Sequence, residues 1–173
     1  MGAFDSAFDE LVELEAAYSD DPLDPGNWTG GVVGKGDLKG TKYGISAATY
    51  PTLDIANLTL SGVKPIYFKD WWLAMHCDRM PSALGSAVLA FSVNLGREEC
   101  AVLLQRALGV VVDEQIGPIT LAKAESLDLN YSVSMFVALC AKHYTSLAGF
   151  AHDGVGWLRR CALVAMYSGK LLQ

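Results

Sequence analysis

The chain has 173 residues, of which 51% are apolar and only 18% charged, which excludes a disordered protein and a disulfide-stapled mini-protein. Thirteen Lys and Arg residues against nineteen Asp and Glu give a formal net charge of −6, and no basic cluster stands out. Nucleic acid is therefore not an expected partner, because nucleic-acid affinity depends on cationic contacts to phosphates.

The first predicted element is an amphipathic helix over residues 3–17. At 100° per residue, Phe4, Phe8 and Leu11 share one stripe, and Glu15 falls within about 20° of Phe4. Burial and the negative end of the helix dipole should both raise the pKa of a carboxyl group there. A raised pKa suits a general acid working near neutral pH. The alternative is a glutamate at a frayed helix end that bends toward water or pairs with a lysine.

Residues 18–46 are rich in Gly, Asp, Pro and Thr, and they predict turns with a small hairpin. Asp24 lies in an Asp-Pro-Gly turn nine residues after Glu15, and Thr29 and Thr41 belong to the same lobe. An acid on a helix that faces a second carboxylate on an ordered loop is the arrangement of glycoside hydrolysis. A separation of roughly 6.5–9.5 Å would leave room for a water molecule and give inversion.

Two helical zones follow, over residues 62–109 and 113–171. The second zone is expected to hold three helices, with breaks at 128–130 and at the His-Asp-Gly turn of 152–154. The longest uncharged stretch, over 80–96, contains Pro and Gly and is too short for a membrane span, so no stable membrane insertion is expected. The pattern predicts a mostly helical α+β fold with one small β-containing lobe.

The cysteines and histidines do not form a metal-binding pattern. No CxxC pair is present, so buried free thiols are expected, and the histidines lack metal spacing, so neither a metal nor a cofactor is expected. A Cys–His peptidase built on Cys77 and His143 is the less favoured alternative. Nothing in the sequence around Cys77 would lower its thiol pKa, and no third orienting residue is evident.

Several motifs occur in order along nearly the whole chain. They are Glu15 to Gly26 (EAAYSDDPLDPG), Gly40 to Ser46 (GTKYGIS), Ile66-Tyr67 with Trp71-Trp72, Val93 to Gly96 (VNLG), Leu104 to Gly109 (LQRALG), Asp113 to Thr120 (DEQIGPIT), and Gly156 to Leu158 with Arg160. Together they resemble glycoside hydrolase family 108, N-acetylmuramidases found among phage endolysins and bacterial accessory lysozymes. The family pattern begins E-G-G-Y-S-N-D-P-x-D-P-G-G-x-T-x-Y-G-I-T, and the motifs from residue 113 onward resemble its peptidoglycan-associated C-terminal lobe.

The resemblance implies that Glu15 is the catalytic acid and that Asp24, helped by a threonine, holds the attacking water. An insertion over 27–39 leaves two candidates for the threonine. Thr41 keeps the Tyr-Gly-Ile context and is favoured, whereas Thr29 keeps the distance from Asp24. Two further departures are Ala-Ala after the acid, where the family has Gly-Gly, and Ala90, where the family often carries an aspartate.

Five residues are predicted to contact substrate: Tyr43, Tyr50, Asn94, Trp72 and Thr29. The two tyrosines lie on or beside the Gly-rich lobe, where their rings could pack on sugars. Neighbouring helical residues point about 100° apart, so at most one of Trp71 and Trp72 should face a cleft, and core packing is the alternative for each. Asn94 could bind substrate or cap the helix expected from Glu98.

The resemblance therefore implies a lysozyme-like fold and a peptidoglycan hydrolase that cleaves the β-1,4 bond between N-acetylmuramic acid and N-acetylglucosamine, with inversion. The alternative is a non-catalytic peptidoglycan-binding or export-accessory module on the same fold. Residues 1–96 are expected to form the catalytic region and residues 97–173 a helical, peptidoglycan-associated lobe that shares its core. The N-terminus lacks the basic start and apolar run of a signal peptide. We therefore expect synthesis in the bacterial cytoplasm and a holin or another export route to the glycan strands of the wall in the periplasm. We also expect a monomer.

Overall fold

The computed structural model describes residues 2–12, 14 and 18–171. They divide into two compact units, one of residues 1–7 with 68–173 and one of residues 8–67. The first helix, α1 (Ala3–Val12), contributes residues to both units. The predicted division into 1–96 and 97–173 concerns cooperative folding and stays a prediction.

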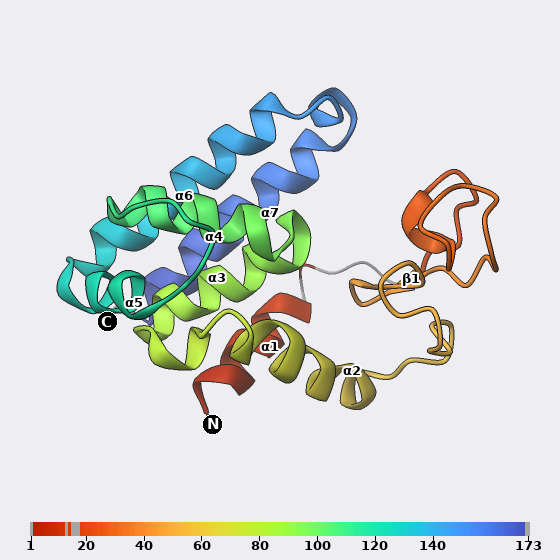
Figure 1. Ribbon diagram of the computed structural model, residues 1–173, viewed down its shortest axis with the longest axis horizontal. Helices are drawn as coiled ribbons and strands as arrows, with labels where there is room; N and C mark the ends of the chain where they lie inside the picture. Colours follow the sequence, from red (N-terminus) through yellow and green to blue (C-terminus); the bar gives the residue numbers. More distant parts are fainter. Residues whose placement is uncertain (1, 13, 15–17, 172–173) are drawn as a thin grey trace. The chain divides into compact units, whose positions relative to one another are not determined.

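The larger unit is helical and is built around helix α3. Ten consecutive residues of α3, 83–92, are buried, and the helix contacts α4, α6 and α7. Its sequence is apolar on every side, as expected for a helix enclosed by others. The elements of this unit after residue 67 are a π-helical turn η2 (Phe68–Leu73), a 3-10 turn η3 (Cys77–Arg79), α3 (Ser82–Leu95), α4 (Arg97–Leu108), α5 (Pro118–Ser126), α6 (Leu129–Ser146) and α7 (Phe150–Lys170) (Figure 1).

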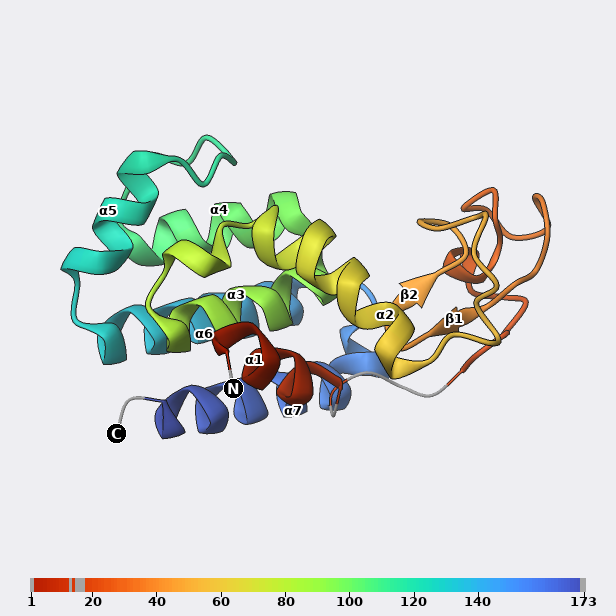
Figure 2. The ribbon, with the colours of Figure 1, turned by 90° about the horizontal axis from the view of Figure 1, so that it is seen from below.

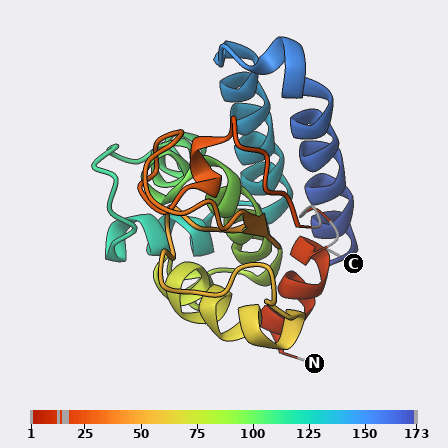
Figure 3. The same ribbon diagram turned by 90° about the vertical axis from the view of Figure 1, so that its right-hand side faces the viewer.

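Helices α6 and α7 lie side by side, as Figure 3 shows. The break predicted at 128–130 falls at 127–128, where the Asp128 carboxylate accepts a hydrogen bond from the Tyr131 amide at 2.8 Å and caps α6. The expected turn at 152–154 is wrong, since these residues lie inside α7 and the break falls at 147–149. A Cβ on Gly154 would stand 2.8 Å from the ring of Phe150, so this glycine allows close packing within the helix.

The core of this unit contains four free, buried cysteines and one buried arginine. Burial raises the pKa of the Cys100 and Cys140 thiols well above the usual range, which keeps both in the unreactive thiol form. Arg160 is 7% exposed and donates a hydrogen bond to the Ala90 carbonyl at 3.0 Å. The Arg160 guanidinium is thus bonded to the backbone of Ala90, the position at which the family pattern often has an aspartate.

The smaller unit, residues 8–67, is mostly loops around a short hairpin (Figure 2). Its elements after α1 are a 3-10 turn η1 (Pro25–Asn27), strands β1 (Thr41–Lys42) and β2 (Ile45–Ser46), and α2 (Leu60–Tyr67). The strands pair antiparallel, with Thr41 opposite Ser46, and Tyr43 and Gly44 between them both have positive φ. A two-residue turn of this kind matches the right-handed twist of the strands. The Tyr67 hydroxyl donates to the Tyr43 carbonyl and fixes the turn.

The predicted fold class, a mostly helical α+β protein with a small β-containing lobe, is confirmed. Among the helices of the described residues, none is both long and apolar enough to cross a membrane.

Candidate active site

Asp24 begins the 3-10 turn η1, and its carboxylate is fixed by that turn. Its Oδ1 atom accepts a hydrogen bond from the Gly26 amide at 2.8 Å. A Cβ on Gly26 would lie 3.1 Å from the same oxygen, so glycine leaves room for this bond. The residue is exposed, and Oδ2 has no hydrogen-bond partner among the described residues. One carboxylate oxygen is therefore anchored while the other faces solvent.

Asn27 joins the Asp24 turn to the strand that carries Thr41. Its side chain is fully buried and donates through Nδ2 to the Asp21 carbonyl at 3.0 Å. Its own carbonyl accepts the amides of Lys39 and Gly40 at 3.0 and 3.1 Å. The Asp24 turn is thus tied by backbone hydrogen bonds to the residue directly before Thr41.

The two candidate threonines differ in how their hydroxyls are used. Thr29 accepts a hydrogen bond from the Asp37 amide at 2.9 Å and thereby closes the inserted loop. The insertion is hairpin-like, with Trp28 paired antiparallel to Leu38. In contrast, the half-buried Thr41 hydroxyl makes no hydrogen bond to any residue that the structure describes. The Thr41 hydroxyl is free to bind water, whereas Thr29 is already part of the loop.

Tyr43 and Tyr50 both lie in the smaller unit and are half-buried. The ammonium of Lys42 stands 5.5 Å from the centre of the Tyr43 ring. Tyr43 adopts a left-handed backbone conformation with φ of 50°, which is uncommon for a tyrosine. The turn therefore fixes the backbone of Tyr43 on the hairpin.

Glu15, the predicted acid, lies outside the described residues. The described part of α1 ends at Val12, with the Leu14 amide bonded to the Leu11 carbonyl at 2.8 Å. The predicted apolar stripe is present in that part, since Phe8 and Leu11 are 4% and 1% exposed. The orientation and pKa of Glu15 stay predictions.

Trp72 and Asn94 belong to the larger unit, whereas the other described candidates belong to the smaller one. Trp72 is 3% exposed and packs edge-on against Phe4, with ring centres 5.6 Å apart. The structure thus gives Trp72 a packing role. Asn94 is exposed and accepts a hydrogen bond from the Tyr144 hydroxyl at 2.6 Å. It does not cap the next helix, which begins after Gly96 without a side-chain cap.

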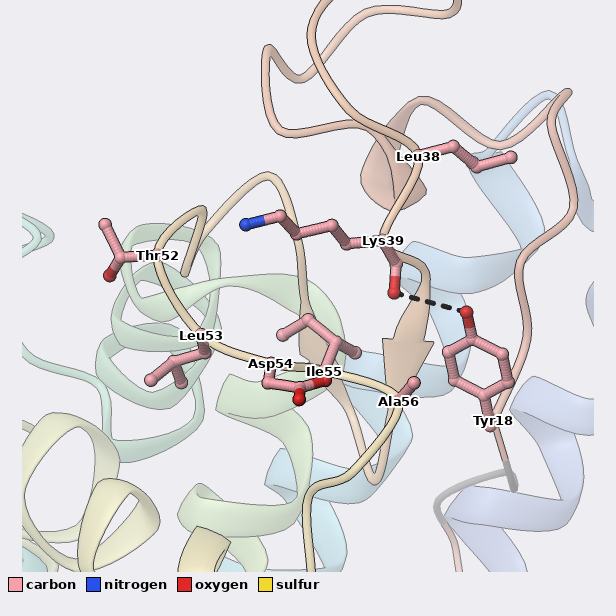
Figure 4. A pocket seen from close by; sticks show the side chains of 8 residues that line it. All are labelled: Tyr18, Leu38, Lys39, Thr52, Leu53, Asp54, Ile55 and Ala56. Carbon is pink, nitrogen blue, oxygen red and sulfur yellow. Dashed lines mark hydrogen bonds between the residues drawn. The ribbon is translucent and has the colours of Figure 1, made fainter.

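A pocket of about 370 Å³ lies in the smaller unit beside the hairpin (Figure 4). Tyr18 forms one side and the loop of residues 52–56 the other. In this view Leu38 lies above Tyr18, and the Lys39 side chain extends toward Thr52. The Tyr18 hydroxyl donates to the Lys39 carbonyl at 3.3 Å. Sequence reasoning did not single out Tyr18, although it stands in the motif that contains Glu15 and Asp24. No local pattern in 52–56 indicated that this loop returns to the hairpin.

The comparisons with known proteins identify a family and a shared fold. The family model described as Glycosyl hydrolase 108 matches residues 8–96, more than half of the chain. Among solved structures, the chain is similar to that of Brucella abortus SagA, with 24% sequence identity and a TM-score of 0.82. That match covers 97% of this chain and 94% of the other, and it shows a shared fold. No curated protein matches the chain.

The chain belongs to glycoside hydrolase family 108. The matched region contains the Asp24 turn, the hairpin and the pocket. Membership makes the protein a glycoside hydrolase of the lysozyme-like N-acetylmuramidase type, with peptidoglycan as its substrate.

Proposed function

We propose that this protein hydrolyses the β-1,4 bond between N-acetylmuramic acid and N-acetylglucosamine, with inversion at the anomeric carbon. Glu15 donates a proton to the leaving oxygen, and Asp24 accepts a proton from the attacking water. The observation that supports this proposal best is the Asp24 carboxylate, which is exposed but held by the Gly26 amide in a family 108 region.

The Asp24 turn suits a general base because it limits the carboxylate to one orientation. The bond from the Gly26 amide fixes Oδ1, so Oδ2 can accept a hydrogen bond from water without first losing rotational freedom. An inverting hydrolase needs a base that binds water and not the sugar carbon itself. An anchored, exposed carboxylate meets that need.

Thr41 is the threonine that we assign to the water. Its hydroxyl can accept one hydrogen bond and donate another, and no described residue occupies it. The backbone of Thr41 is held on both sides, because its amide and carbonyl pair with Ser19 at 2.8 and 2.9 Å. A threonine fixed in this way can orient water toward Asp24 at little cost in entropy.

The test is digestion of purified peptidoglycan followed by mass spectrometry of the products. The proposal requires products with N-acetylmuramic acid at the new reducing end. Asp24→Asn should lower the rate by about 10²–10⁴-fold, since that is the usual contribution of general base catalysis. Asp20→Asn is the matched control, because Asp20 is exposed in the same loop and has no hydrogen-bond partner among described residues. Equal rates for the two variants, or reducing-end N-acetylglucosamine, would refute the proposal.

We further propose that the enzyme acts as an endolysin on the periplasmic wall after release from the cytoplasm. Production in a bacterium should then cause lysis only when a holin is produced with it. Lysis that is equally fast without a holin would contradict this role while leaving the hydrolase activity in place.

A further inference from the structure

We propose that the pocket between Tyr18 and residues 52–56 is a subsite for one neutral N-acetylhexosamine ring of the glycan strand. Its volume of about 370 Å³ is near the lower end of the range for small-molecule pockets, which suits one ring better than a disaccharide. The inference rests on the proposed function, because the glycan that supplies the ring is the substrate proposed there.

The walls of the pocket are held in place without a ligand. Lys39 donates through Nζ to the Pro51 carbonyl and Lys42 to the Ala56 carbonyl, each at 2.7 Å. These two bonds fasten both ends of the 52–56 loop to the hairpin. Tyr18 is fixed on the other side by its hydroxyl and by close packing on Gly40, where a Cβ would lie 2.6 Å from the ring. A pocket with fixed walls loses little entropy when it binds.

The lining combines an apolar face with hydrogen-bonding groups at its edge. Tyr18 is 39% exposed and the half-buried Leu53 adds aliphatic surface, whereas Ile55, 1% exposed, lies beneath the lining. The Asp54 carboxylate is exposed, and one of its oxygens accepts from Asn57 at 2.9 Å. A pyranose ring presents C–H groups on its faces and hydroxyl and acetamido N–H donors at its rim. Tyr18 fits a ring face, and the second oxygen of Asp54 fits a rim donor.

The charges of the lining favour a neutral ligand over a charged one. Lys39 and Asp54 contribute one positive and one negative charge, which leaves no net charge. The Lys39 ammonium is already bonded to the Pro51 carbonyl. In peptidoglycan the stem peptides carry the carboxylates, whereas N-acetylglucosamine is neutral. The pocket therefore fits N-acetylglucosamine better than a muramyl stem peptide.

The experiment measures binding of the N-acetylglucosamine β-1,4 tetramer to the full chain by calorimetry, in the Asp24→Asn background to prevent turnover. Tyr18→Ala should weaken binding about tenfold, since loss of an aromatic contact is worth about 1.4 kcal/mol, and Asp54→Ala should weaken it several-fold. Tyr18→Phe should bind within about twofold of the parent, because the hydroxyl bonds to the protein. Tyr131→Ala, at a 51% exposed tyrosine of the larger unit, is the matched control.

Absence of tetramer binding to the parent, or unchanged binding after both Tyr18→Ala and Asp54→Ala, would overturn the subsite. Equal weakening by Tyr131→Ala would do the same. Wall digestion by the wild-type chain, measured alongside, tests the proposed function separately. Digestion with no effect of Tyr18 on tetramer binding removes only the subsite, whereas Tyr18-dependent binding without digestion removes only the proposed reaction.

Discussion

Replacement of Gly40 by alanine should destabilise the smaller unit through two separable effects. Gly40 has φ of 84°, in the left-handed region that costs a residue with a Cβ about 1–2 kcal/mol. A Cβ there would also lie 2.6 Å from both the Ser19 carbonyl oxygen and the Tyr18 ring. Because real Cβ contacts are essentially never under 3.0 Å, either the Ser19 backbone that pairs with Thr41 or the Tyr18 ring must move. Overpacking of this kind costs about 1–3 kcal/mol.

Gly34→Ala separates the two effects. Gly34 has φ of 78°, but nothing lies within 4 Å of the position of its Cβ. Urea unfolding should therefore show a loss of about 1–2 kcal/mol for Gly34→Ala and about 2–5 kcal/mol for Gly40→Ala. A Gly40→Ala loss no larger than the Gly34→Ala loss would refute the tight packing of Tyr18 on the hairpin.

Three further changes test other parts of the structure. Ala90→Asp places a carboxylate beside Arg160 and should keep the free energy of unfolding within about 1.5 kcal/mol of wild type. Ala87→Asp, at a fully buried position, should lower that free energy by at least about 3 kcal/mol. Equal losses would show that Arg160 does not compensate the new charge. Asn27→Ala removes the buried side-chain hydrogen bond to the Asp21 carbonyl and should cost about 1–3 kcal/mol in urea unfolding. An unchanged midpoint would show that this bond does not stabilise the loop before the Asp24 turn. The Cys100 thiol, whose pKa is raised by burial and then by Glu99, should resist iodoacetamide at pH 8 in the native chain and react in denaturant. The Cys100 thiol contributes fully to the free energy of unfolding below the unfolded pKa of about 8.5, and above it the contribution falls by up to about 1.4 kcal/mol per pH unit. Cys100→Ala should therefore make the loss of stability at alkaline pH less steep. An equally steep loss in the variant would show that the Cys100 thiol does not cause it.

The helical unit could be predicted from sequence because its signals are local. The apolar run of α3 indicates an enclosed helix, and the polar sequence at 128–130 indicates a break, which the structure has at 127–128. The break before α7 was misplaced because His-Asp-Gly is also typical of a turn. The glycine there is required by its contact with Phe150, one turn earlier, and a propensity argument does not detect that contact.

The candidate site could be predicted only in part, because some of it depends on contacts between residues far apart in the sequence. Asp24 stands out because Asp-Pro-Gly defines its own turn, and the structure shows the expected anchoring of its side chain. The choice between Thr29 and Thr41 depends on how the insertion folds, which spacing alone does not reveal. The pocket beside Tyr18 depends on lysine bonds to carbonyls more than ten residues away, so no local pattern indicates it.

The most direct test of the mechanism is the anomeric configuration of the first product. Proton NMR of fresh wall digests, recorded before mutarotation, distinguishes α- from β-anomeric reducing ends. Direct attack by a water bound to Asp24 predicts α-anomeric ends at the earliest time points. Initial β-anomeric ends would contradict the account, because they require a covalent glycosyl intermediate and make a carboxylate the nucleophile in place of the general base.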